Sequence, residues 1–225
     1  MGFSNISIDL IFGIPGSSDN TLKKNIEIIS SFGIPHVSCY ALTIEPKTAL
    51  NFFVQKGKME ATKDEESASQ FQLIQREMAI CGYELYEISN YCQPGAESRH
   101  NTGYWRGEKY LGIGPSAHSF NGESRQWNIP NNAFYTKALN KGELLFETEV
   151  LTPEMKYQEY VLTSIRTKWG CDLERIRTMG LDFYHKICNQ MLPLLKNGLL
   201  KLENEVLYLT EKGYFLSDYI TRELF

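Results

Sequence analysis

The sequence predicts an α/β domain followed by a smaller α+β domain of winged-helix pattern, and three observations lead to this prediction. Two apolar, β-branched runs at residues 6–12 and 37–42 flank a helical pattern, which is the order of a right-handed parallel strand–helix–strand unit. After residue 150, three helical segments precede two short strands. Between these regions, residues 89–132 are rich in glycine, proline, asparagine and aromatic side chains.

Length and composition indicate two modest domains, which we place at residues 1–150 and 151–225. The chain is 42% hydrophobic and 22% charged, as expected of a globular protein. No apolar run reaches the about 20 residues of a membrane span, and no signal peptide is visible, so we expect a cytoplasmic protein. A net charge of −4 argues against a nucleic-acid partner.

The first strand is expected from Ile6 to Phe12 and reads as buried on both faces. Gly13 to Gly16 then turns the chain, and Ser18 or Asp19 caps a helix. The apolar positions of that helix fall at helical spacing, at Leu22, Ile26, Ile29 and Phe32.

Residues 43–57 read as a loop, and Thr62-x-x-Glu65 has the form of a capping box. The helix that follows has one apolar face, made by Ala68, Phe71, Ile74 and Met78. Residues 83–88 have the composition of a strand.

Residues 89–132 are predicted to form a long functional loop, because structureless loops beyond roughly 12–15 residues are uncommon unless they bind something. A helix is expected after it, at 131–141.

The last 75 residues predict a helix that begins at Thr152-Pro153 and runs to about Trp169, with four apolar or aromatic positions inward, Tyr157, Tyr160, Val161 and Ile165. The remaining elements are helices at 172–179 and 183–196, strands at 199–202 and 206–209, and a closing helix at 214–224. A winged-helix pattern is typical of DNA-binding domains, but these 75 residues hold ten basic and ten acidic side chains, which favours a structural or lid role.

Asp9 lies in an apolar strand just before a glycine-rich turn. A carboxylate at the C-terminal end of a parallel strand faces the side where ligands collect, but a side chain that caps the following turn explains the residue equally well. The turn itself, Gly13-Ile14-Pro15-Gly16, lacks the lysine of a phosphate-binding loop and reads as a plain connection.

His100 stands beside Asn101 and four residues before Tyr104-Trp105. An imidazole with nearby rings suits a flat aromatic ligand, while a structural role for the histidine is an equal alternative. Further on, Gly112 and Gly114 permit a close approach of the backbone to a bound group.

The motifs taken together resemble the C-terminal portion of the oxygen-independent coproporphyrinogen III oxidase-like proteins of the radical S-adenosylmethionine (SAM) superfamily, the HemN/HemW family. The first part carries the resemblance in IDLIFGIPG, PHVSCYALTIEPKTAL, GYELYEISNYCQPGAESRHN, HNTGYW and YLGIGPSAHS. The tail carries it in EYVLTSIRTKWG, NGLL and LYLTEKGYFLSDYI. An H-N-x-x-Y-W motif is typical of the haem-chaperone branch.

The resemblance implies a fold, a ligand set and a function. The fold would be the C-terminal part of a (β/α)6 partial barrel, followed by the winged-helix-like domain. The SAM-contacting positions would be Asp9, Thr43 and His118. The suspected haem-binding positions would be His100, Asn101, Tyr104 and Trp105. The function would be haem binding for transfer to acceptor proteins, with oxidative decarboxylation of coproporphyrinogen III as the alternative.

The sequence departs from the family in one large respect. The family holds a [4Fe-4S] cluster with a C-x3-C-x2-C motif, and the 225 residues contain none. The first four barrel strands also have no counterpart, so we expect a piece of a longer protein that would not cleave SAM alone. An unpaired barrel strand would expose a sheet edge, which predicts a homodimer through that edge.

Overall fold

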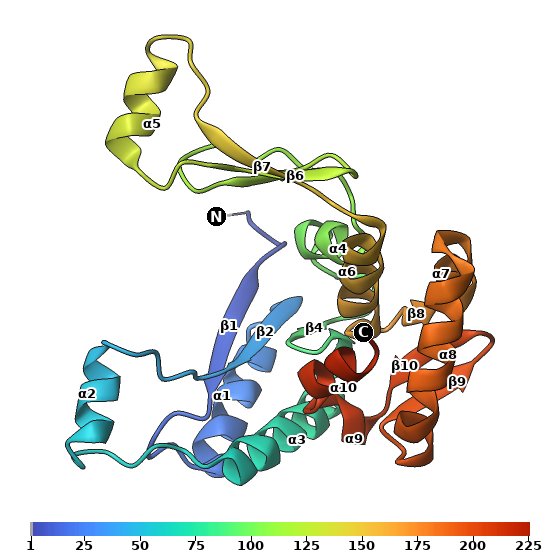
Figure 1. The fold of residues 1–225 in the computed structure, drawn as a ribbon. Coiled ribbons are helices and arrows are strands. Elements are labelled where there is room, and N and C mark those ends of the chain that lie inside the picture. The colour runs from blue at the N-terminus through green and yellow to red at the C-terminus, as the bar shows by residue number, and fades with distance from the viewer. Residues whose placement is uncertain (1) are drawn as a thin grey trace. The chain divides into compact units, whose positions relative to one another are not determined.

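The computed structural model describes residues 2–225, which form two compact units, residues 2–98 and 99–225 (Figure 1). The first unit has one sheet and the second has two, and each unit has its own buried core. The two are described separately below.

The first unit is built on a four-stranded sheet of order β1-β2-β4-β3. Strands β1 and β2 are parallel, whereas β4 is antiparallel to both of its neighbours. The strands are β1 (Ser7–Phe12), β2 (His36–Ala41), β3 (Glu84–Glu87) and β4 (Asn90–Cys92). The helices are α1 (Asp19–Ser31), α2 (Ala49–Gln55) and α3 (Asp64–Ile80).

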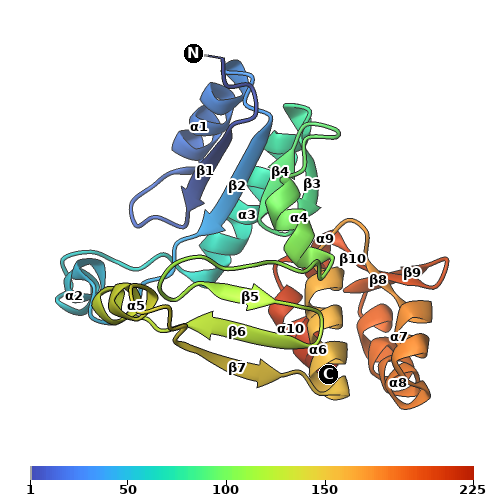
Figure 2. The same ribbon diagram turned by 90° about the horizontal axis from the view of Figure 1, so that it is seen from above.

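The core of this unit lies between one face of the sheet and the helices α1 and α3, which also pack on each other (Figure 2). Leu10 and Phe12 point into it from β1, while Asp9 and Ile11 alternate with them and are exposed. Burial of β1 on both faces was therefore a wrong prediction. The strand alternates because no element of the unit covers its second face among the described residues.

Two further predictions for this unit were wrong. Thr62 caps nothing: its hydroxyl donates to the carbonyl of Gly13 over 2.8 Å, and α3 begins after Lys63 without a side-chain cap. The predicted loop at 43–57 contains α2, capped by Thr48. This helix buries no residue and is only seven residues long, so its apolar positions are too few to establish a helical period.

The second unit contains two three-stranded antiparallel sheets, β5-β6-β7 and β8-β10-β9. The strands are β5 (His118–Phe120), β6 (Ser124–Asn128), β7 (Phe146–Val150), β8 (Cys171–Asp172), β9 (Leu200–Glu203) and β10 (Val206–Leu209). The helices are α4 (Arg99–Trp105), α5 (Asn132–Leu139), α6 (Pro153–Ile165), α7 (Leu173–Met179), α8 (Leu181–Lys196), α9 (Glu211–Tyr214) and α10 (Ser217–Glu223).

The prediction of one long loop at 89–132 was wrong, because four elements lie within these residues: β4, α4, β5 and β6. They are three to seven residues long and carry mainly polar and aromatic side chains. Such short elements show neither a helical nor an alternating period. Their hydrogen bonds and ring contacts stabilise them where propensity does not.

The C-terminal elements follow the sequence closely. The Thr152 hydroxyl accepts from the amide of Met155 over 3.2 Å, with Pro153 at the first helical position, and all four predicted inward residues of α6 are buried. The helix ends at Ile165, short of the predicted Trp169. The hairpin β9–β10 turns at Asn204 and Glu205, both with positive φ, as a two-residue turn requires. The closing segment divides into α9 and α10.

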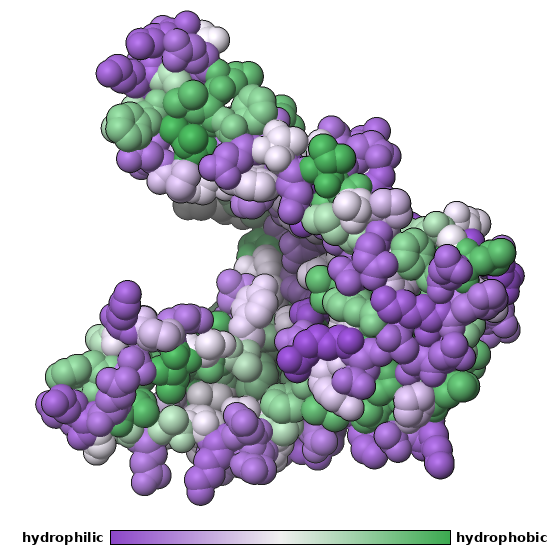
Figure 3. Space-filling view, viewed as in Figure 1, coloured by the Kyte–Doolittle hydropathy of each residue, from purple (hydrophilic) through white to green (hydrophobic). Residues whose placement is uncertain are grey.

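Apolar side chains gather on the surface of α5 and of the chain that leads from it to β7 (Figure 3). Phe134 is 61% exposed and Leu144 70% exposed, well above the other apolar residues of these segments. Among the described residues, no helix is both long and apolar enough to cross a membrane.

Candidate functional site

The short helix α4 carries the His100–Trp105 motif and spaces its rings. His100 and Tyr104 lie one turn apart, so they share a face of the helix, and their rings meet edge to face with centroids 4.8 Å apart. Tyr104 then meets Tyr110 edge to face, also at 4.8 Å. The imidazole of His100 is exposed. Its ring is therefore accessible to a ligand and held in orientation by Tyr104.

Tyr104 and Trp105 line a cavity of about 360 Å³ that lies wholly within the second unit. The cavity is bounded by α4 and the loop after it, by β5 and β6, and by α6 and α7. Its aromatic wall consists of Tyr104, Trp105, Tyr110, Phe120 and Tyr160. His100 and Asn101 are not part of the lining; His100 adjoins it through Tyr104.

Four cationic side chains line the same cavity, Arg106, Arg125, Lys156 and Arg175. Three of them lie over aromatic rings. Arg106 lies over Trp169 with the guanidinium carbon 4.7 Å from the ring centre, and Arg175 lies over Tyr160 at 4.2 Å. Arg125 lies over Phe120 at 5.5 Å. Contact with a ring orients a guanidinium without neutralising its charge.

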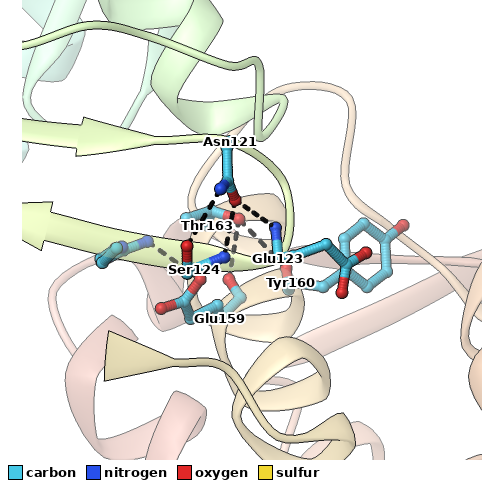
Figure 4. A network of polar contacts seen from close by, with 7 residues as sticks. Asn121, Glu123, Ser124, Glu159, Tyr160 and Thr163 are labelled. Carbon is cyan, nitrogen blue, oxygen red and sulfur yellow. Dashed lines mark hydrogen bonds and ion pairs between the residues drawn. The ribbon is translucent and has the colours of Figure 1, made fainter. Parts of the chain in front are cut away.

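Two of the cations also pair with carboxylates that fasten the β5–β6 hairpin to α6. Arg125 bonds to Glu159 over 2.9 Å, and Lys156 bonds to Glu123. Figure 4 shows the Asn121 side chain in the hairpin turn, where its oxygen accepts from the amides of Glu123 and Ser124. The turn lies beside Glu159 and Tyr160 of α6 (Figure 4).

Burial and the nearby Cys171 thiol raise the pKa of the Tyr160 hydroxyl to about 12, so the ring stays neutral at ordinary pH. The same hydroxyl accepts from the amide of Asp172 over 3.0 Å. Tyr160 therefore serves as a fixed wall of the cavity and as a surface for Arg175.

The glycine-rich segment before His118 packs on its own strand. A side chain at Gly112 would overlap the backbone of His118, and the Gly112 amide donates to the Ser119 hydroxyl over 2.9 Å. The close approach that glycine permits is thus made here to β5. His118 itself is exposed, with its ring 6.0 Å from that of Trp127.

The other two predicted SAM positions lie in the first unit. Asp9 is the third of six residues of β1, so it lies in the middle of the strand and not at its C-terminal end. It pairs with Ser38, whereas Thr43 follows two residues after β2 ends. Thr43 is five residues beyond Ser38, the partner of Asp9, so at about 3.3 Å per residue the two lie roughly 16 Å apart along the strand direction. The structure does not place these two residues side by side.

The sheet face that carries Asp9 is polar. His36 lies there, buried, with one ring nitrogen 2.7 Å from the Ser7 hydroxyl and the other 2.7 Å from the Tyr86 hydroxyl. Burial lowers the pKa of His36, while the carboxylate of Asp9 acts in the opposite direction and more weakly. A neutral imidazole with one donor and one acceptor nitrogen satisfies both hydroxyls.

The described residues do not fit an iron–sulfur cluster. No three histidine, cysteine or acidic side chains among residues 2–225 come together as a metal site. Three of the cysteines, Cys39, Cys92 and Cys171, are buried, and burial raises the pKa of the Cys39 and Cys171 thiols, which keeps them protonated. A cluster requires thiolates that converge, so no step is derived through one in this chain.

The structure thus brings together part of the predicted set. Tyr104 and Trp105 meet at the cavity, and His100 adjoins it. The four cations were missed by sequence reasoning, because they come from separate elements between Arg106 and Arg175 and share no spacing. Of the four, only Arg106 follows directly on the His100–Trp105 motif, so only its position in the sequence could have indicated a binding role.

Comparisons with known proteins agree with the motifs. No family model matches the chain. The haem chaperone HemW of Mycobacterium tuberculosis (strain ATCC 25618 / H37Rv) is 34% identical over 224 residues, which are 99% of this chain and 56% of that protein. The haem chaperone HemW of Bacillus subtilis (strain 168) is 31% identical over 224 residues, 97% of this chain and 58% of that protein.

A solved structure shares the fold. The coproporphyrinogen III oxidase (HemN) from Escherichia coli, a radical SAM enzyme, superposes with a TM-score of 0.76 at 18% identity, over 99% of this chain and 55% of that one. This chain spans little more than half the length of the curated relatives named above. It is homologous to the haem chaperone HemW proteins and corresponds to a C-terminal portion of these longer relatives.

Proposed function

We propose that the protein to which this chain belongs is a haem chaperone, which binds haem through the second unit and passes it to acceptor proteins. The single observation that carries this proposal is the exposed His100 imidazole, set edge to face on Tyr104 beside a cavity with an aromatic wall. Imidazole is a common axial ligand of haem iron, and flat rings suit a porphyrin. The names of the similar proteins agree with this function.

The whole protein would hold SAM and a [4Fe-4S] cluster largely outside the described residues. In this proposal residues 1–150 form the last strands of the partial barrel with a glycine- and aromatic-rich extension, and residues 151–225 form a winged-helix-like domain. Asp9, Thr43 and His118 remain the proposed SAM positions. The cluster would supply one-electron chemistry when bound, and this chain would contribute only side chains that contact SAM.

The test is a haem titration of the chain followed by absorbance. His100→Ala should shift the Soret band and weaken binding by about tenfold or more, since one iron ligand is lost. His185→Ala is the matched control, because His185 is also exposed and also lies against a tyrosine ring, at 6.1 Å. His118→Ala tests the second exposed histidine of the motif region.

If wild type and His100→Ala give the same spectrum and the same affinity, His100 is not a ligand. If His118→Ala alone changes the spectrum, the ligand lies in the glycine-rich segment. Absence of any saturable haem binding would contradict the proposed function for this part of the protein.

The edge of β1 supports the proposal of a homodimer, in which this edge would pair with a strand of a second copy of the chain. In the described sheet, β1 pairs with β2 alone and stands at the end of the strand order. Light scattering should give a dimer at micromolar concentration, and Ile11→Lys in β1 should shift it to monomer, because a charge on an edge strand opposes strand pairing. Ile28→Lys in α1, at similar exposure, is the control. A monomeric wild type would end this proposal.

A further inference from the structure

The cavity of the second unit has a chemical character that its proposed role does not explain. Its aromatic wall would suit any flat ligand. Four cationic side chains line it against two acidic ones, Glu108 and Glu159. A purely apolar partner would desolvate the unpaired cations without supplying acceptors for them, which is costly.

Two of the cations have no carboxylate partner among residues 2–225. The side chains of Arg106 and Arg175 each contact an aromatic ring and form no ion pair there. Both guanidinium groups are exposed towards solvent and carry five N–H donors in a fixed fork. Such a fork matches a carboxylate in shape and charge.

Polar atoms without hydrogen-bond partners in two lining residues also indicate a surplus of donors. The indole nitrogen of Trp105 and the Nε of Arg125 are buried and have no hydrogen-bond partner among the described residues. Both residues line the cavity, and both atoms are donors. Buried polar atoms are normally paired, so two orphaned donors in lining residues add to the surplus of donors around this cavity.

We infer that this cavity binds the carboxylate edge of a tetrapyrrole, its two propionate groups, while the ring lies against the aromatic wall. The inference rests on the proposed function. A volume of about 360 Å³ is at the low end for a small-molecule pocket and takes one edge of a porphyrin, not the whole ring. The contact of His100 with Tyr104 places the iron ligand beside the cavity and outside its lining.

The experiment separates carboxylate recognition from iron ligation by using metal-free porphyrins. Protoporphyrin IX and its dimethyl ester are titrated against the chain in the same cosolvent, with porphyrin fluorescence as the readout. Neither compound can be ligated through iron. The diacid should bind at least about tenfold more tightly than the diester, because each charge-assisted hydrogen bond contributes more than a neutral one.

Variants of the two unpaired arginines test whether these side chains bind the carboxylates. The double variant Arg106→Gln, Arg175→Gln should lose about tenfold or more in affinity for the diacid and leave the diester unchanged. Neither substitution orphans a carboxylate, since neither arginine is paired. Arg76→Gln is the control, because its side chain is 64% exposed on α3 of the first unit. Raised salt should weaken diacid binding alone.

Three results would overturn the inference. Equal affinity for diacid and diester would do so on wild-type protein alone, whatever the variants do. An equal loss of both ligands in the double variant would indicate a packing defect. Displacement of the diacid by succinate at equal concentration would mean that the cavity takes any dicarboxylate. If haem binds but diacid and diester are equal, the proposed function stands and the carboxylate site falls; if no porphyrin binds, both fall.

Discussion

The two units of this chain place their polar groups differently. In the first unit, polar side chains line one face of a sheet, where the buried His36 ring lies within hydrogen-bond distance of the Ser7 and Tyr86 hydroxyls. In the second unit, arginines and aromatic rings from five elements surround a cavity and leave donors unsatisfied. The residues of the proposed haem site thus all lie in one unit, whereas the proposed SAM positions are divided between both.

The largest expected effect concerns the integrity of the second unit. Gly112→Ala should lower the free energy of unfolding by about 2–3 kcal/mol, because the added methyl group would overlap the His118 backbone and a strand cannot yield as a side chain does. Hydrogen exchange should show the loss in β5 and β6 and leave β1 and β2 protected. Gly103→Ala is the control, since it meets only the flexible Glu108 side chain. Equal loss in both units would contradict independent cores.

A smaller effect is expected from one buried hydrogen bond of the second unit. The Tyr157 hydroxyl donates to the carbonyl of Leu224 over 2.6 Å and ties α6 to the end of the chain. Tyr157→Phe should cost about 1–2 kcal/mol, because the carbonyl is left without that donor. Tyr219→Phe, on an exposed tyrosine, should change little in the same urea denaturation. A cost below the error of the extrapolation would show that water replaces the hydroxyl.

The smallest effect concerns the first unit and its dependence on pH. Burial holds the pKa of His36 below its ordinary value of 6.5, so the unfolded chain binds more protons than the folded one once the pH falls below that value. Stability should therefore fall on acidification below about pH 6.5, by at most about 1.4 kcal/mol per pH unit from this group. The free energy of unfolding of wild type and His36→Gln, measured from pH 7.5 to 5, gives the slope.

In that comparison His36→Gln should be less stable at neutral pH, because its contacts with Ser7 and Tyr86 change, but its slope should be shallower than that of wild type. Identical slopes would mean that other groups carry the pH dependence. His185→Gln, on an exposed histidine of the second unit, controls for a general effect of histidine titration.

The sequence predicted those parts of the fold whose residues repeat with a period. Helix α6 was predicted from its Thr152-Pro153 start and its inward faces, and the parallel pair β1–β2 from two apolar runs. Helix α2 was missed because it buries nothing, and β5 and β6 because they are short and polar. Their formation depends on contacts with distant segments, such as the bond between Arg125 and Glu159.

The residues of the candidate site also differ in whether the sequence could predict them. His100, Tyr104 and Trp105 are adjacent in the chain, so a motif could indicate them. Arg125, Lys156 and Arg175 meet only after the hairpin has folded against α6 and α7. No spacing rule connects them, and only the folded backbone brings their charges to one cavity.

The aromatic residues at the cavity determine where the tryptophan fluorescence of this chain arises. The chain contains three tryptophans, Trp105, Trp127 and Trp169, and all of them lie in the second unit. Trp105 lines the cavity, and Trp169 carries the guanidinium of Arg106. Indole emission therefore arises from the second unit alone, and two of its three sources are at or next to the proposed site. The protein carries its own optical reporter there, while the first unit stays dark at the same wavelength.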